Sequence, residues 1–391
     1  MSLRLTLAVA VLATAALADG GNEPTVRGAP SPPPLDKPKS FPARAGAQST
    51  PRAVGRFHLL LDVVPASSAR LFDVRDGSVL ELALPMADLA RQHPDVVGAS
   101  KPGAPPPFWW TVLGYEPEPK RVSLLISTPH GPALTHFSVG GTEFERPTVV
   151  APGVEDGAPR AYGFTPDGAL VVVAWRYADP KATANIVTVK RIDLASGAVT
   201  QTEHRFPHET PNYSSPYLFT DPTFAWVAMS VQVSTPRDDA PVRFVEVATG
   251  AFFDVPAPPN AQSVTIDAAS ATAWIASTRT GVIQRVNLKT KKVELEKKGF
   301  GRVHSMVLSP SGKALLVMPS TSSFYTVDPV TLAVRTSTTW AAWLGTPIVF
   351  PWENRVAAAG DWVVITDVDE VGHPNDPEKK RTVALRWKSA K

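Results

Sequence analysis

Apolar and polar positions alternate over short runs along most of this chain, and turn-forming residues separate one run from the next. Runs such as RVSLLIST, IVTVKRIDL, VIQRVNL and WVVITDV are rich in Val, Ile and Thr. Alternation with a period of two over such short segments is typical of β-strands. Only PMADLARQH, residues 85–93, has a short helical pattern. The sequence therefore predicts an all-β protein.

The turn-forming residues between the runs form two periodic series of turns. A first turn precedes a buried strand near Glu116-Pro117, Asp167-Gly168, Asp221-Pro222, Asp267-Ala268, Pro310-Ser311 and Glu353-Asn354. A second turn follows a strand of the x-Val-Asp-Leu kind at Asp76-Gly77, Gly140-Gly141, Ser196-Gly197, Thr249-Gly250, Thr290-Lys291 and Val330-Thr331. A period of roughly 40–50 residues with several strands per unit indicates β-propeller blades, which must stack in a ring to bury their faces.

The repeats predict a seven-bladed β-propeller, with units near residues 57–85, 108–150, 160–206, 214–256, 262–298, 302–338 and 344–390. A six-bladed ring is the alternative, if the first and last units are parts of one blade. The last unit, which ends TVALRWKSA, is placed to lend or complete a strand of the first unit and so to close the ring.

Two stretches, TPDGALVVV and SPSGKALLV, resemble the S-P-D-G-K-x-L-x-V signature of bacterial WD40-like propeller repeats of the TolB-like and YVTN types. The runs VKRIDLASGAVTQ, VRFVEVATGAFFD and IQRVNLKTKKVEL are similar to the third and fourth strands of those repeats. The resemblance covers about residues 55–391 and implies the fold, while it says little about function. The first unit lacks a clear Pro-Asp-Gly turn, and the YVTN tetrapeptide itself is absent.

The N-terminal region predicts an exported protein. MSLR precedes the apolar stretch LTLAVAVLATAALA, and Ala16-Leu17-Ala18 matches a small-x-small cleavage site. We therefore expect a signal peptide at 1–18, a proline-rich disordered linker at 19–53 and the propeller at 54–391, in the periplasm or outside the cell. No later run reaches about 18 apolar residues, so we expect no transmembrane span.

Composition excludes several classes of protein and site. The formal charge of +3 is spread along the chain, which disfavours a nucleic-acid binder. The chain has no cysteine, which excludes disulfides, thiolate metal sites, a cysteine nucleophile and a lipid-modified N-terminal cysteine. No G-x-S-x-G, H-E-x-x-H, Walker A or G-x-G-x-x-G motif is present.

Aromatic residues next to loops are the candidate ligand-binding residues, because an aromatic ring at a loop offers a stacking surface for a sugar or peptide. These are Trp109 and Trp110 after the proline-rich loop KPGAPPPF, together with Trp340, Trp343 and Trp352. Trp175, Trp226, Trp274, Trp362 and Trp387 lie within strand runs, which favours packing between blades.

Metal-site candidates are few. Asp367 and Asp369 share one face of a strand and could offer oxygens to Ca²⁺, although the spacing does not match a calcium loop; a solvated hairpin tip is the alternative. His204 and His208 are separated by Pro207, which favours a polar loop between blades over a metal site. No other cofactor is expected.

Two functions stay open at this point. The first is a monomeric binding scaffold for an envelope protein or a cell-surface glycan or peptide, without catalytic chemistry. The second is a lactonase- or hydrolase-like propeller enzyme with a metal-assisted site at the channel mouth, assembled from His, Asp or Glu of separate blades.

Overall fold

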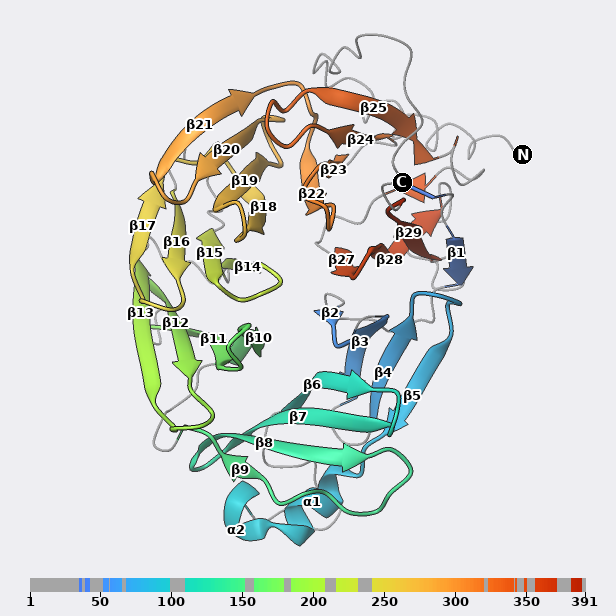
Figure 1. Ribbon diagram of the computed structural model, residues 1–391, viewed down its shortest axis with the longest axis vertical. Coiled ribbons are helices and arrows are strands. Elements are labelled where there is room, and N and C mark those ends of the chain that lie inside the picture. The colour runs from blue at the N-terminus through green and yellow to red at the C-terminus, as the bar shows by residue number, and fades with distance from the viewer. Residues whose placement is uncertain are drawn as a thin grey trace, which may run out of the picture.

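The computed structural model describes residues 35–36, 39–42, 52–55, 57–64, 68–98, 110–151, 158–178, 184–207, 216–230, 241–319, 323–340, 342, 348–349, 356–370 and 381–388. Their strands form seven antiparallel sheets that follow one another around a ring (Figure 1). The seven-bladed prediction is confirmed, and the first and last units are separate blades. Each blade has an innermost strand near the centre of the ring and an outermost strand on its rim.

The first four blades follow the chain order. Blade 1 contains β2 (Arg52–Ala53), β3 (His58–Val64), β4 (Ser68–Asp73) and β5 (Val79–Ala83). Blade 2 contains β6 (Trp110–Glu116), β7 (Arg121–Thr128), β8 (Gly131–Ser138) and β9 (Thr148–Val149). Blade 3 contains β10 (Ala158–Phe164), β11 (Leu170–Tyr177), β12 (Ala184–Ile192) and β13 (Val199–Pro207). Blade 4 contains β14 (Tyr217–Thr220), β15 (Trp226–Ser230), β16 (Val242–Glu246) and β17 (Phe252–Val255).

The remaining three blades complete the ring. Blade 5 contains β18 (Ala261–Asp267), β19 (Thr272–Ser277), β20 (Ile283–Asn287) and β21 (Lys292–Lys297). Blade 6 contains β22 (Val303–Leu308), β23 (Leu315–Pro319), β24 (Ser323–Val327) and β25 (Val334–Thr339). Blade 7 contains β27 (Val356–Ala359), β28 (Trp362–Glu370), β29 (Arg381–Arg386) and β1 (Lys39–Pro42), and β26 (Ile348–Val349) also pairs with β28.

The ring is closed by the N-terminal segment. Strand β1 pairs antiparallel with β29, from Lys39 opposite Ala384 to Pro42 opposite Arg381. The direction of closure is therefore the reverse of the expected one, since an early strand completes the last blade. Pro42 is compatible with this position because an outermost strand leaves one edge unpaired.

Leu35 fixes the same segment to the core. It is 2% exposed, and a backbone bridge pairs it with Trp387. The amide of Asp36 also donates a hydrogen bond of 2.8 Å to the carbonyl of Arg386. Residues 35–36 and 39–42 are thus part of blade 7, although the proline-rich composition of 19–53 predicted a disordered linker. The predicted signal peptide at 1–18 lies outside the described residues.

Burial explains why the interior strands do not show a simple alternation. Every residue of β23 and β24 is buried, because neighbouring blades cover both faces of these strands. The outermost strand β21, KVELEK, instead alternates between exposed and half-buried positions. Trp274, Trp362 and Trp387 lie in apolar clusters that join neighbouring blades, as predicted.

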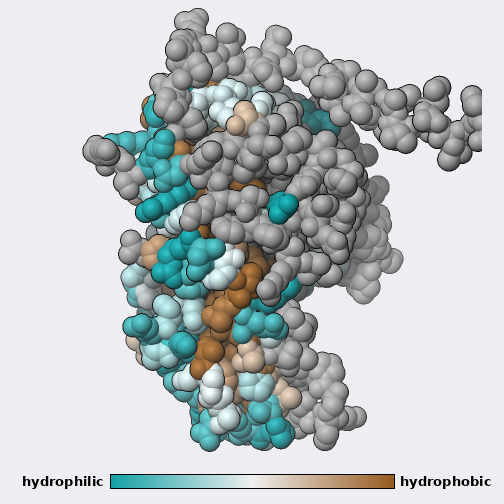
Figure 2. Space-filling model, turned by 90° about the vertical axis from the view of Figure 1, so that its right-hand side faces the viewer, coloured by the Kyte–Doolittle hydropathy of each residue, from teal (hydrophilic) through white to brown (hydrophobic). Residues whose placement is uncertain are grey.

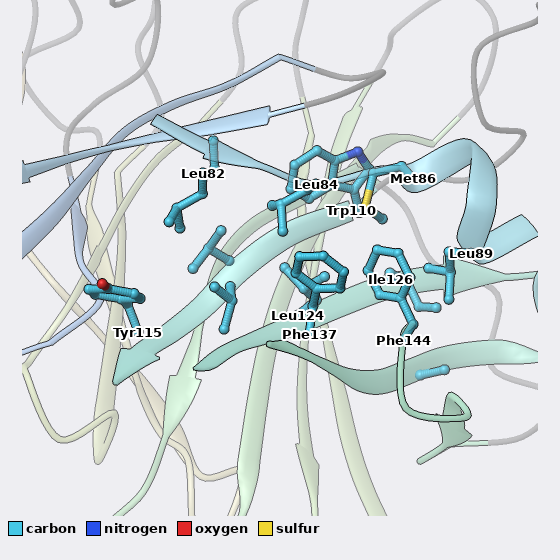
Figure 3. Close-up of a cluster of buried hydrophobic side chains, with 14 of the residues drawn as sticks. Leu82, Leu84, Met86, Leu89, Trp110, Tyr115, Leu124, Ile126, Phe137 and Phe144 are labelled. Atoms are coloured by element: carbon cyan, nitrogen blue, oxygen red, sulfur yellow. The ribbon is translucent and has the colours of Figure 1, made fainter. Parts of the chain in front are cut away.

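Helices α1 (Met86–Gln92) and α2 (Pro94–Val97) connect blade 1 to blade 2. The helical pattern of 85–93 is confirmed by α1, whereas α2 was not predicted. Met86 and Leu89 pack into the apolar cluster between the two blades (Figure 3).

On the rim beside these helices, Figure 2 shows an apolar band at the height where Figure 1 places β4 and β5, and Leu80 of β5 is 38% exposed. None of the described helices is long and apolar enough to cross a membrane.

Candidate functional site

The two faces of the ring carry different connections. One face, here the turn face, carries the connections from the first to the second strand of each blade and from the third to the fourth strand of blades 1–6. The opposite face, here the loop face, carries the connections from the second to the third strand and from each blade to the next. The two faces follow from the antiparallel order of the strands in every sheet.

The turn face is built from repeated short turns, apart from the longer connection of residues 139–147 between β8 and β9. After the third strand, Asp193, Asn287 and Asp328 occupy equivalent positions, and each side-chain oxygen accepts two backbone N–H bonds at 2.8 to 3.0 Å. These Asx turns satisfy backbone donors locally. A backbone bond then ties this turn to the first turn of the same blade, as from Leu288 to Ala271 at 2.9 Å.

The predicted turn series belong to this face. The second series coincides with the connections after β4, β8, β12, β16, β20 and β24, and the first series coincides with the connections after β6, β10, β14, β18 and β22. In blade 7 the first and second strands, β27 and β28, are joined at Gly360-Asp361. The predicted turn at Glu353-Asn354 lies outside the described residues.

The long connections of the chain leave from the loop face. They span residues 84–109 between β5 and β6, 231–241 between β15 and β16, 340–355 between β25 and β27, and 371–380 between β28 and β29. Of the sequence-predicted site residues that the structure describes, Trp110 and Trp340 lie at strand ends beside these connections, and Asp367 and Asp369 lie in the last part of β28. Topology therefore gathers onto one face residues that lie far apart in the sequence.

The two predicted tryptophans that the structure describes are core residues. Trp110 is 3% exposed and lies beside Leu84 and Met86 in the cluster of blades 1 and 2 (Figure 3). Trp340 is 0% exposed, and its ring centroid is 4.4 Å from that of Phe324. Neither ring presents the exposed stacking surface that was expected, because each fills apolar volume at an edge of a blade. Trp109, Trp343 and Trp352 lie outside the described residues.

Asp367 and Asp369 lie on β28, and Asp369 is paired through its backbone with Val349 of β26. The structure does not describe their side chains, so the Ca²⁺ hypothesis stays a prediction. Within the part of the chain that is described, no three His, Asp or Glu side chains are grouped so that they could hold a metal ion.

A repeated β-bulge marks the innermost strands at the loop face. The pairing register shifts at Arg160 of β10, Gln262 of β18 and His304 of β22, each of which is the extra residue opposite the second strand of its blade. Bulges re-aim side chains and are frequent beside functional sites. The sequence carried this signal in PRAY, AQSV and VHSM, but the signal appears only when the repeats are aligned on the bulge.

The connections of blades 5 and 6 approach each other at this face. The amide of Phe300 donates a 3.1 Å hydrogen bond to the carbonyl of Gly281, and a Cβ on Gly281 would lie 2.7 Å from the carbonyl oxygen of Gly301. Arg279 and Arg302, both exposed, lie close to these two glycines in the sequence. We call this region, made of residues 256–263, 277–283 and 298–305, the blade 5–6 corner.

Side-chain hydrogen bonds fix the polar groups of the corner. The Nε2 of Gln262 donates to the Oδ1 of Asn260 at 2.9 Å, and the Nδ2 of Asn260 donates to the Oγ1 of Thr278 at 2.8 Å. Burial, and then the charge of Arg302, lower the pKa of His304 below its usual value. The corner is therefore a fixed array of hydrogen-bonding groups, and its connections also carry the exposed residues Arg279 and Arg302.

Blade 3 presents a second group of polar and aromatic side chains at the loop face. The guanidinium of Arg160 lies 4.8 Å from the ring centroid of Trp175, whose Nε1 donates to the Oδ1 of Asn185 at 2.9 Å. Tyr177 contacts the edge of the same indole, with centroids 4.8 Å apart. Trp175 is half-buried: it packs against the apolar cluster of blades 3 and 4, as its place in a strand run predicted, and part of it lies at the surface.

His204 is not part of a loop. His204 lies within β13, is 1% exposed, and packs against the ring of Phe252 at 5.1 Å. Burial, followed by the charge of Arg243, lowers the pKa of His204 to about 4. The imidazole is therefore neutral at pH 7 and serves packing between blades 3 and 4. His208 lies outside the described residues.

The sequence was also compared with known proteins. No protein-family model matches the chain. A search of curated proteins finds no match either. The fold is that of a seven-bladed β-propeller, consistent with WD40-like repeats, and the site rests on the geometry given above.

Proposed function

We propose that this protein is an exported β-propeller that serves as a binding scaffold in the cell envelope, with the loop face as its ligand-binding face. The ligand is an envelope protein or a cell-surface glycan or peptide. The observation that carries the proposal is the contrast between the two faces: long connections and bulged polar residues on one, repeated short turns on the other. Binding residues are concentrated on long loops that a rigid scaffold positions.

The kinship with TolB-like and YVTN-type propellers is part of the same proposal. It is supported by the Pro-x-Gly turns at Asp167-Gly168 and Ser311-Gly312, which lie between β10 and β11 and between β22 and β23. Export is supported by the sequence of residues 1–18. Sequencing the N-terminus of the mature protein tests it, with Asp19 as the expected first residue.

A matched pair of variants on one strand tests the choice of face. Arg160 lies near the loop-face end of β10, and Phe164, which is 41% exposed, lies at the turn-face end of the same strand. In a pull-down from envelope extract, we expect Arg160→Glu to lose most of the captured ligand and Phe164→Ser to retain it. Equal capture by both variants and the wild type would overturn the assignment of the face, and a wild type that captures nothing would count against the scaffold itself.

A further inference from the structure

The blade 5–6 corner combines cationic side chains with an absence of carboxylates. Its sequences are PAPPNAQS, STRTGVI and KGFGRVHS, which contain Arg279, Arg302 and Lys298 and no Asp or Glu. The turns from first to second strand on the opposite face instead carry acidic residues, at Asp167, Asp221, Asp267 and Asp361. The charged side chains of the corner's own segments are therefore all cationic, whereas two of these acids, Asp167 and Asp361, are paired with Arg191 and Arg386.

The backbone brings the two arginines of the corner together. Arg279 is two residues before Gly281, and Arg302 directly follows Gly301. Because the backbones at Gly281 and Gly301 are in contact, both arginines belong to connections that meet in one small area of the loop face. Both glycines have positive φ, at 63° and 68°, so this close approach depends on residues without a Cβ.

The surrounding polar groups are already ordered. The chain of bonds from Gln262 to Asn260 to Thr278 fixes the amide orientations, and the amides of Arg279 and Thr280 are held by the Oγ of Ser277 at 3.0 and 2.9 Å. A site whose groups are fixed before binding loses less entropy when a ligand arrives. Guanidinium groups pair with carboxylates and phosphates through two parallel hydrogen bonds.

We propose that the blade 5–6 corner binds an anionic ligand through carboxylate or phosphate groups, with Arg279 and Arg302 as the charged contacts. This inference rests on the proposed function and names the chemistry of its ligand. The shared feature is an oxyanion that accepts two hydrogen bonds from a guanidinium. Whether the oxyanion belongs to a phosphate or to a carboxylate is distinguished by the two arms of the test.

The test is calorimetric titration of the full chain with pyrophosphate in one arm and citrate in the other, at low and at physiological salt. We expect a single site for at least one probe. The double variant Arg279→Gln, Arg302→Gln should weaken that binding by about tenfold or more, since a hydrogen bond to a charged group contributes about 1.5–3 kcal/mol. The preferred probe identifies the oxyanion.

Arg205→Gln is the matched control, because Arg205 is an exposed arginine of the outermost strand β13. It removes the same charge away from the corner and should change the affinity less than twofold. Binding of neither probe would overturn the inference, as would equal weakening by the control and the double variant. Arg279→Gln alone provides a second reading if the double variant has a lower unfolding temperature.

Failure of this inference can be told apart from failure of the proposed function. If the double variant still captures the wild-type ligand from envelope extract, the two arginines do not bind that ligand. The anion-site inference then fails, while the proposed loop-face scaffold is retained. Capture of nothing by the wild type would count against the scaffold, whatever the titrations show. Loss of both captured ligand and probe binding in the double variant supports both proposals.

Discussion

The turn face and the loop face of this ring are stabilised by contacts of different range. On the turn face, Asp193, Asn287 and Asp328 each close a turn with donors two and three residues away. On the loop face, the corner of blades 5 and 6 joins residues from separate strands, as where Gly281 meets Gly301. Local contacts can repeat identically from blade to blade, whereas contacts between connections can vary in each blade. The variable face is therefore the one suited to selecting a ligand.

Gly281→Ala tests the contacts of the loop face, and we expect it to have the largest effect of the variants that compare the two faces. A Cβ there would meet the carbonyl oxygen of Gly301 at 2.7 Å and its nitrogen at 2.9 Å, at a φ of +63°. Because backbone rather than a flexible side chain must move, we expect a loss of about 3–4 kcal/mol in the free energy of unfolding. Urea unfolding measures it. A loss of unfolding free energy no larger than that of Gly168→Ala, where a Cβ would meet nothing within 4 Å, would show that the corner is not tightly packed.

Leu35→Ala tests blade 7, whose third and fourth strands, β29 and β1, are not joined by a turn. Blade 7 joins Leu35 to Trp387, between segments from opposite ends of the sequence. Leu35 is buried among residues such as Trp387 and Leu385, so its truncation should cost about 2–3 kcal/mol.

Limited proteolysis gives a second readout for Leu35→Ala. In the wild type, residues 35–42 should be protected and should stay with the propeller. The variant should release a stable fragment that starts near residue 54. Equal cleavage of both proteins near residue 54 would contradict the docking of this segment.

Asp328→Asn probes a turn-face cap through pH. Burial favours the neutral acid, but backbone hydrogen bonds from Thr331 and Val330 and the guanidinium of Arg335 outweigh it and lower the pKa of Asp328 to about 2. The unfolded chain has the ordinary value near 3.8, so the charged form adds stability above pH 4 that is lost as the pH falls through 2. We expect this contribution to be about 1–2 kcal/mol.

The asparagine variant keeps the turn acceptor, as Asn287 does in blade 5, and loses the charge. Its unfolding free energy should therefore change less between pH 5 and pH 2 than that of the wild type. Identical pH profiles for the two proteins would mean that Asp328 is not a stabilising charge.

Gly168→Ala is the turn-face partner of Gly281→Ala and should have the smallest effect of the four. Gly168 has a φ of +82°, but a Cβ there would meet nothing within 4 Å. The cost is then the left-handed conformation alone, about 1 kcal/mol. Thermal unfolding of both alanine variants in one buffer gives the difference. A similar loss for the two would show that φ, and not the contact between connections, determines the cost at Gly281.

The sequence by itself determined the β-propeller and nearly all turns of the turn face, and it predicted seven blades with six as the alternative. The physical reason is range: alternation sets a strand, and an Asp or Gly at a fixed offset sets a turn, within a few residues. The same local information predicted α1 and the packing role of Trp274, Trp362 and Trp387.

Only the tertiary structure decided the partner of each strand end and the exposure of each aromatic ring. KSFP became strand β1 because β29 offers an unpaired edge far along the chain. Trp110 and Trp340 became core residues because neighbouring strands enclose them. Arg160, Gln262 and His304 came to share one position through bulges in three different blades. Burial and juxtaposition of this kind arise from contacts between residues that are distant in sequence, which no local pattern specifies.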